Sequence, residues 1–184
     1  AGANRMFNEG FWFYCSSSSN DIDRYVKYNY ADNTWDIGSL SRTAWVDFGL
    51  HSKPRGAGVS DSLNYIYSHE TGTTDDGEAM SPFIESSVFS IGDGDQFSFI
   101  SRLIPDVDIS SSDSDTAVDY VLKTRDYPGN SLTTNSTSSV TSTTEQAFLR
   151  SRARSAVLRI QSSASDVQWT LGDVRFDIRP DGRR

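Results

Sequence analysis

Apolar and polar residues alternate along several short stretches of the chain, and this alternation predicts β-strands. Successive side chains of a strand point to opposite faces, so a period of two indicates one buried and one exposed face. The clearest run is 173–179, in which Val174, Phe176 and Ile178 form an apolar face and every intervening residue is charged. Similar runs occupy Arg24–Tyr30, Ala117–Thr124 and Val167–Leu171.

Residues that favour turns separate these runs. Ala31–Asn33 lies between two alternating stretches and is short enough for a hairpin, and Gly92–Asp95 and Asp126–Gly129 follow other candidate strands. Candidate strands of about four to nine residues between such turns are typical of all-β proteins. We therefore expect an all-β fold.

The segment Glu145–Ile160 has two interpretations. As a helix it would place apolar residues on one face, with Ser142 and Glu145 as a capping box. As two strands it would place Phe148 and three arginines on one face, with Leu158 and Ile160 in the core. We favour two strands, because every other periodic signal along the chain has a period of two.

The acidic stretch Thr71–Glu78 predicts a boundary between two parts, residues 1–77 and 78–184. Residues 130–144 are rich in Ser and Thr and predict an exposed loop or a strand at a sheet edge. We expect the second part to be an antiparallel sandwich or jelly-roll-like domain. Its predicted core consists of Phe89, Phe97, Phe99, Ile104, Tyr120, Leu122, Leu158, Trp169 and Phe176.

Charge and cysteine content narrow the functional classes. The 184 residues include 17 Lys and Arg against 25 Asp and Glu, a net charge of −8, which is opposite to that of most proteins that grip phosphate backbones. Residues 1–145 carry a net charge near −12 and the remainder near +4. No apolar run approaches the roughly 20 residues of a membrane span. The single cysteine excludes an internal disulfide and suits a reducing cytoplasm or a particle assembled there. Because the chain does not begin with Met, we expect a fragment or a processed product.

No motif in the sequence indicates catalysis, a metal or a cofactor, so we expect none of the three. The two histidines, His51 and His69, are far apart and lack metal-ligand spacing, and no G-x-S-x-G elbow occurs. The Gly92–Asp95 stretch lacks the third glycine of a dinucleotide-binding loop. Paired aspartates are read as turn residues, with a calcium site or a glycosidase pair as alternatives. These pairs are Asp75/Asp76, Asp93/Asp95, Asp106/Asp108 and Asp113/Asp115.

The C-terminal arginines are the most distinctive candidates for interaction, because Arg is favoured where carboxylates or phosphates are held. Three interpretations are open for these arginines. They could form a subunit or partner interface, or they could contact DNA. They could also lie on a solvated sheet face, where their charge is balanced by Asp173, Asp177 and Asp181. The interface candidates are Arg150, Arg152, Arg154, Arg175 and Arg179. The aromatic-rich opening is either a core strand or a sugar-stacking platform. It contains Phe7, Phe11, Trp12, Phe13 and Tyr14.

Several strings resemble a known family. Residues 23–47 resemble a propeller blade, with a strand, a tight turn and a Trp-bearing strand. FIESSVFSIGDGDQFSFISRLIPDV at 83–107, KTRDYPG at 123–129 and DIRPDGRR at 177–184 resemble the C-terminal half of a bacteriophage virion structural protein. The most similar class is the tail-hub or nozzle protein of short-tailed phages, also called packaged-DNA stabilisation protein.

This resemblance implies a partial β-propeller followed by a smaller β-rich domain, in a non-enzymatic component of the virion tail. Such proteins assemble in the host cytoplasm as homo-oligomeric rings that meet the portal or adaptor and other tail proteins. Packaged DNA would pass through the lumen without specific binding, and no membrane would be involved. About 75 residues form only one or two blades, so further residues or other subunits would complete the propeller.

Two alternatives to this function remain. A carbohydrate- or receptor-binding β module of a tail protein would expose a pair of aromatic side chains on one sheet face. A glycosidase-like propeller would need two carboxylates about 5–9.5 Å apart in a cleft.

Overall fold

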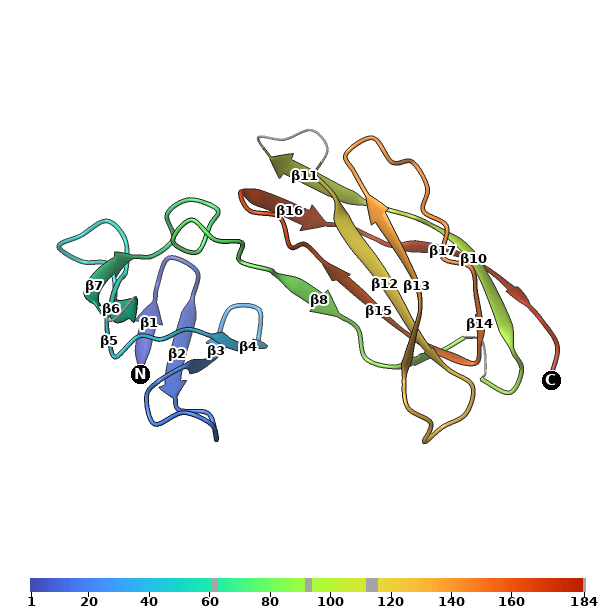
Figure 1. Cartoon of the computed structure of the whole chain (residues 1–184), viewed down its shortest axis with the longest axis horizontal. Coiled ribbons are helices and arrows are strands. Elements are labelled where there is room, and N and C mark those ends of the chain that lie inside the picture. Colours follow the sequence, from blue (N-terminus) through green and yellow to red (C-terminus); the bar gives the residue numbers. More distant parts are fainter. Residues whose placement is uncertain (61–62, 92–93, 112–115, 184) are drawn as a thin grey trace. The chain divides into compact units, whose positions relative to one another are not determined.

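Figure 1 presents a computed structural model of the chain, which describes residues 1–60, 63–91, 94–111 and 116–183. Strands make up 53% of the structure, the described residues contain no helix, and the antiparallel sheets do not close. The expected all-β class is therefore confirmed. The chain divides into two compact units, Ala1–Thr71 (unit 1) and Gly72–Arg184 (unit 2), at the start of the acidic stretch.

Unit 1 consists of two small sheets built from neighbouring strands. The first has the order β1 (Gly2–Asn4), β2 (Glu9–Tyr14), β3 (Arg24–Asn29) and β4 (Thr34–Ser39), and the second has the order β5 (Ala44–Val46), β6 (Arg55–Ser60) and β7 (Leu63–Ser68). The expected hairpin between β3 and β4 is held by Asn29, whose Oδ1 accepts bonds from the N–H groups of Ala31 and Asp32. Asn33 completes this turn with a φ of 56°, which Asn tolerates better than most residues.

The interior of unit 1 mixes aromatic and charged side chains. The Phe11 ring is buried and lies 5.4 Å from the ring of Trp45. On the same face of the sheet, Lys27 Nζ lies 2.9 Å from Glu9 and 3.3 Å from Asp36. Unit 1 therefore depends on polar pairs as well as on apolar packing.

The two histidines lie in different surroundings. The ring of His69 packs 4.6 Å from that of Trp45, and His69 Nε2 accepts a bond from the Nε of buried Arg42. His51 is exposed. His69 thus belongs to the packing of unit 1.

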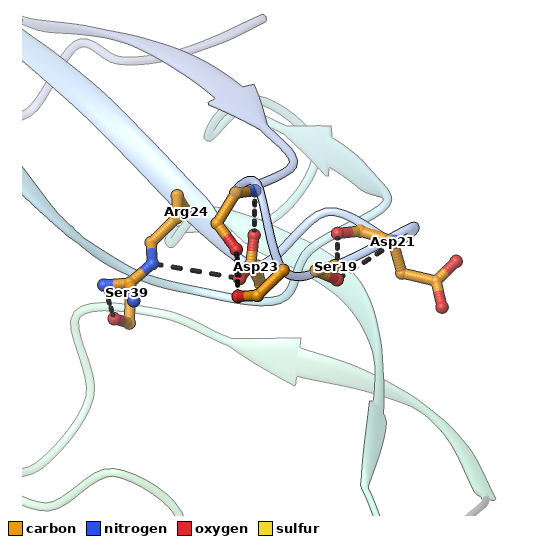
Figure 2. A network of polar contacts seen from close by, with 7 residues as sticks. Ser19, Asp21, Asp23, Arg24 and Ser39 are labelled. Atoms are coloured by element: carbon orange, nitrogen blue, oxygen red, sulfur yellow. Dashed lines mark hydrogen bonds and ion pairs between the residues drawn. The ribbon is translucent and has the colours of Figure 1, made fainter.

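A polar network fixes the connection between β2 and β3 (Figure 2). The Asp23 carboxylate accepts hydrogen bonds from the N–H and the hydroxyl of Ser16, each at 2.7 Å. Arg24 lies 3.8 Å from the same carboxylate and donates a bond to Ser39 on β4. The bonds from Ser16 hold the pKa of Asp23 below its ordinary value of 3.8, because they favour the charged form.

We expect Ser16→Ala to raise the pKa of Asp23 toward 3.8, because one of the two bonds to the carboxylate is lost. A lowered pKa means that the ionised carboxylate stabilises the folded connection at neutral pH. This contribution is lost as the pH falls below 3.8 and through the folded pKa. Carboxyl chemical shifts in an NMR titration measure the change. The control is Ser19→Ala, since the Ser19 hydroxyl bonds to Asp21 and not to Asp23; equal titration of Asp23 in both variants would contradict the assignment.

Unit 2 has a sandwich-like arrangement of antiparallel strands. Its larger sheet has the order β13 (Thr133–Val140), β12 (Val118–Arg125), β15 (Ser155–Gln161) and β8 (Phe83–Glu85), with β9 (Phe89–Ser90) also pairing with β15. Facing it, β10 (Ser98–Ile104) lies between β14 (Ser151–Ala153) and β17 (Arg175–Pro180), and β11 (Val107–Ser111) pairs with β16 (Val167–Leu171). Apolar side chains from both sets of strands share one core cluster.

Strands β10 and β11 pair with β17 and β16, and the two paired segments are separated by a short break in each chain direction. The two breaks lie next to each other. Pro105 and Asp106 separate β10 from β11, and Gly172, Asp173 and Val174 separate β16 from β17. The N–H of Gly172 donates to the carbonyl of Asp106 at 2.7 Å, and the N–H of Asp173 donates to the Asp106 carboxylate. A Cβ on residue 172 would lie 2.5 Å from that carboxylate, so only glycine fits this approach without a shift.

Most of the expected core is found at the centre of unit 2. Tyr120, Leu122, Leu158 and Phe97 are buried, and Phe89, Trp169 and Phe176 pack partly buried against the cluster.

Two residues of the predicted core lie elsewhere. Ile104 is 45% exposed, so the prediction is wrong for this residue. Phe99 lies on the outer face of β10, where the Arg179 guanidinium covers its ring. The register of β10 against β17 shifts between Ile100 and Arg102, so Ile100 and Leu103 face the core although they are three residues apart.

The segment Glu145–Ile160 forms strands β14 and β15 and no helix, as expected. Leu149, Ser151 and Ala153 are buried, whereas the intervening side chains are exposed or half-buried. Part of the Ser/Thr-rich stretch forms β13, at one edge of the larger sheet. The aspartates Asp93, Asp113 and Asp115, named above as candidate ligands, lie outside the described residues.

Candidate functional site

The predicted arginines of unit 2 gather on the outer face of the β14–β10–β17 sheet. Antiparallel pairing places Phe99 opposite Arg152 on one side and opposite Arg179 on the other. The Arg179 guanidinium lies 5.0 Å from the centre of the Phe99 ring, within the range of a cation–π contact. We call this surface, with Arg102, Arg150, Arg152, Arg154, Arg175 and Arg179, the arginine face.

Two arginines cover a second aromatic ring. The guanidinium groups of Arg152 and Arg154 lie 3.9 and 4.8 Å from the centre of the Phe97 ring, and Arg154 also lies 5.0 Å from the ring of Tyr127. Phe97 is only 5% exposed beneath them. The side chains of Arg152 and Arg154 are therefore held by stacking, which lowers the entropy lost when such a group binds a partner.

The arginine face is only partly balanced by carboxylates. Arg102 pairs with Asp177 at 3.1 Å, and Arg152 pairs with Asp181 at 2.6 Å. The remaining guanidiniums of the face lie within 4.0 Å of no carboxylate in the described part of the chain, which applies to Arg150, Arg154, Arg175 and Arg179. The face therefore carries an excess of positive charge on an otherwise acidic chain.

The sheet does not place all five predicted arginines at one point. Arg152 and Arg179 flank Phe99, whereas Arg175 lies at the far end of β17 opposite Ile104. Arg150 precedes β14, with its guanidinium 6.0 Å from the ring of Phe148. Sequence reasoning missed the supporting rings of Phe97, Phe99 and Tyr127, because period-two spacing gives the face of a strand but not its partner.

A second surface lies on the outer side of the β2–β3–β4 sheet in unit 1. Pairing aligns Trp12 with Val26 and Ile37, and Tyr28 with Trp35. The rings of Trp12 and Trp35 lie 6.0 Å apart with 30° between their planes, and Tyr28 lies 4.6 Å from Trp35. We call this surface, with Trp12, Tyr14, Val26, Tyr28, Trp35 and Ile37, the aromatic face.

The aromatic face is exposed although it is the less charged side of its sheet. Trp12 is 49% and Trp35 64% exposed, whereas the ion pairs of Lys27 lie on the opposite side. The aromatic opening of the chain is thus divided by strand alternation, with Phe11 packed inward and Trp12 outward. No pattern in the sequence indicates that Trp35 lies beside Trp12.

The described residues contain neither a cluster of three potential metal ligands nor a membrane-spanning helix. Within them, no three His, Cys, Asp or Glu side chains are close enough to share a metal ion. The same residues include no helix of the length and apolarity that a membrane crossing requires.

Comparison of the sequence with protein-family models and with curated proteins finds no match.

Proposed function

We propose that this chain is a non-enzymatic structural component of a bacteriophage virion, which acts by assembly at the head-to-tail junction or tail hub of a short-tailed phage. The observation that carries the assembly role is the arginine face, where the guanidiniums of Arg150 and Arg179 lie against aromatic rings. These two groups and Arg175 lack carboxylate partners among the described residues. Guanidiniums of this kind form bidentate bonds to carboxylates of a neighbouring subunit. The sequence resemblance supplies the phage assignment.

In this proposal, the strands of unit 1 belong to a propeller that further residues or other subunits complete, and unit 2 is a jelly-roll-like domain. The exposed apolar side chains of Val46 and Ile66, on one face of the β5–β6–β7 sheet, support this view, because an isolated sheet with an uncovered apolar face is only marginally stable. The partners are other copies of the chain in a ring, the portal or adaptor, and other tail proteins. Assembly takes place in the bacterial cytoplasm.

The charge distribution supports a position around a DNA conduit. Residues 1–145 contain 9 Lys and Arg against 21 Asp and Glu. An acidic wall would repel phosphates and let the duplex pass without specific binding. A ring lumen lined by the arginine face would contradict this position.

The assembly role predicts an oligomer whose formation depends on the arginine face. We expect the double variant Arg175→Glu/Arg179→Glu to reduce association by about tenfold or more, because like charges replace attractive contacts at the interface. Sedimentation velocity of the full chain measures its oligomeric state at low and moderate salt. The control Arg55→Glu reverses an exposed charge in unit 1 and is expected to assemble normally. A chain that stays monomeric at all concentrations would exclude the ring.

A second function, that of a carbohydrate- or receptor-binding module of a tail protein, is favoured by the aromatic face. This function leads one to expect an exposed pair of aromatic side chains on one sheet face, and Trp12 and Trp35 have this arrangement. Exposed aromatic clusters of this size mark binding sites in many proteins. The two functions use different surfaces, the arginine face and the aromatic face, and are compatible in one tail protein.

A further inference from the structure

We propose that the aromatic face binds a neutral polysaccharide, with Trp12, Tyr28 and Trp35 stacking against the C–H faces of its sugar rings. The inference deepens the carbohydrate- or receptor-binding function and rests on it. It names the ligand class and the residues that contact the ligand.

The arrangement of the three rings suits an extended ligand more than a single small molecule. Trp12 on β2 and Trp35 on β4 lie on either side of β3. The centres of their rings are 6.0 Å apart, and the ring planes differ by 30°. Tyr28 lies between them along β3 and contacts Trp35 at 4.6 Å. The three rings, which we call the platform, therefore gather on one side of three neighbouring strands, where adjacent units of a sugar chain could contact them.

The chemistry of the platform favours sugars. The face of an aromatic ring is electron-rich, and it attracts the weakly positive C–H groups on one side of a pyranose. Sugar hydroxyls need polar partners at the edges, and the platform has them at both ends of β3. Arg24 and Ser39 lie at one end. At the other end, the Tyr28 hydroxyl donates to Oδ1 of the exposed residue Asn33, whose side-chain NH2 group can donate to a ligand.

The size of the face argues against a second protein as its occupant. Three strands about 4.8 Å apart and six residues long, at about 3.3 Å per residue, cover roughly 300 Å². A stable protein–protein interface needs about 800 Å² on each partner. Patches near 300 Å² are large enough for a small ligand or a sugar chain.

Charge separates neutral glycans from the other ligands that stack on aromatic rings. Nucleobases also stack on Trp and Tyr, but their phosphates need a basic surface. Arg24 is the one charged side chain that the register places on this side of β2, β3 and β4, and it lies 3.8 Å from Asp23. With a net charge of −8, the chain disfavours polyanions, so a neutral sugar chain is the occupant to which these observations point.

Affinity electrophoresis of the full chain in gels containing dextran, laminarin, mannan or galactan tests the proposal. We expect at least one of these polysaccharides to retard the native chain. Trp12→Ala and Trp35→Ala should each weaken that retardation by about tenfold, because each removes one stacking ring. Trp35→Phe keeps a smaller ring and should retain part of the binding.

Matched variants separate loss of the site from loss of the fold. Ile66→Ala removes an exposed apolar side chain from β7, in the other sheet of unit 1, and should leave retardation unchanged. Circular dichroism should show that Trp12→Ala and Trp35→Ala remain folded, as expected for side chains that are about half exposed. Retardation in none of the four gels, or retardation that survives in both Trp→Ala variants, would overturn the proposal. If the labelled chain bound intact bacteria without any retardation, the receptor-binding function would stand and the polysaccharide site would fall.

Discussion

Replacing Leu122 by Ala is expected to lower the free energy of unfolding of unit 2 by about 2–5 kcal/mol. Leu122 lies in the middle of β12, opposite Leu158 of β15, and its side chain is completely buried in the shared core. Removing three carbons there exposes the remaining core side chains to an empty space that the two sheets cannot close without distorting their hydrogen-bonded ladders. The loss therefore includes both the transfer free energy and the cost of a cavity.

Native-state hydrogen exchange at the amides of β12 and β15 measures this effect, because these central strands should open only when the sandwich unfolds. The matched control is Leu132→Ala, in the connection between β12 and β13, where the side chain is 37% exposed. We expect that control to change stability by less than about 0.5 kcal/mol. Equal protection in the two variants would mean that β12 does not lie at the centre of the core.

The second large effect is expected in unit 1, where Gly58→Ala should cost about 1–3 kcal/mol. A Cβ at residue 58 would lie 2.6 Å from the carbonyl oxygen of Ser41 and 2.9 Å from the Arg42 guanidinium. The carbonyl belongs to the backbone and cannot rotate away as a side chain would. The displaced Arg42 would also lose its stacking on the Tyr67 ring, at 3.9 Å, and its bond to His69.

Gly49→Ala provides the comparison, because nothing lies within 4 Å of a Cβ at that position. Alanine there should be neutral or slightly stabilising, since it restricts the unfolded chain. Hydrogen exchange at the amides of β6 and β7 reports on both variants. If Gly58→Ala protected these amides as well as Gly49→Ala does, the close approach of β6 to Ser41 would be wrong.

Period-two alternation was sufficient to predict the fold class and many strands. The stretch Val167–Leu171 coincides with β16, and Arg24–Tyr30 ends one residue beyond β3. Strands were also favoured for Glu145–Ile160 because every other periodic signal has a period of two, and the alternating burial of Leu149, Ser151 and Ala153 agrees with this. These features are local, since each depends only on which way successive side chains of one strand point.

Structural features that depend on the pairing of two distant segments could not be predicted from the sequence. The register shift in β10 reverses which side chains face the core after Ile100, and no residue type marks it. Ile104 was expected in the core but is exposed, since the shift leaves Ile100 and Leu103 as the residues that face the core. The pairing of Trp12 with Trp35 across β3, and the stacking of Arg152 on Phe97, likewise follow from strand neighbours that a single sequence does not reveal.

The residues of the arginine face were therefore predicted better than those of the aromatic face. The five arginines were named from charge alone, but which of them have carboxylate partners depends on the placement of Asp177 and Asp181 by the turns of the C-terminal segment. The aromatic face was anticipated only as a set of rings near the start of the chain. Strand alternation then assigned Trp12 to the exposed side and Phe11 to the packed side.

The order of strands in unit 2 determines when it can fold during synthesis on the ribosome. β10 pairs with β17, so Arg102 meets Asp177 across 75 residues of sequence, and β8 pairs with β15 across a similar distance. The sandwich therefore cannot close until the last strand has left the exit tunnel. Unit 1 pairs only consecutive strands, so it is free to fold while the remainder is still being translated. A nascent chain halted before Arg175 would carry the paired strands of unit 1 and an unfinished unit 2 that is exposed to chaperones and proteases.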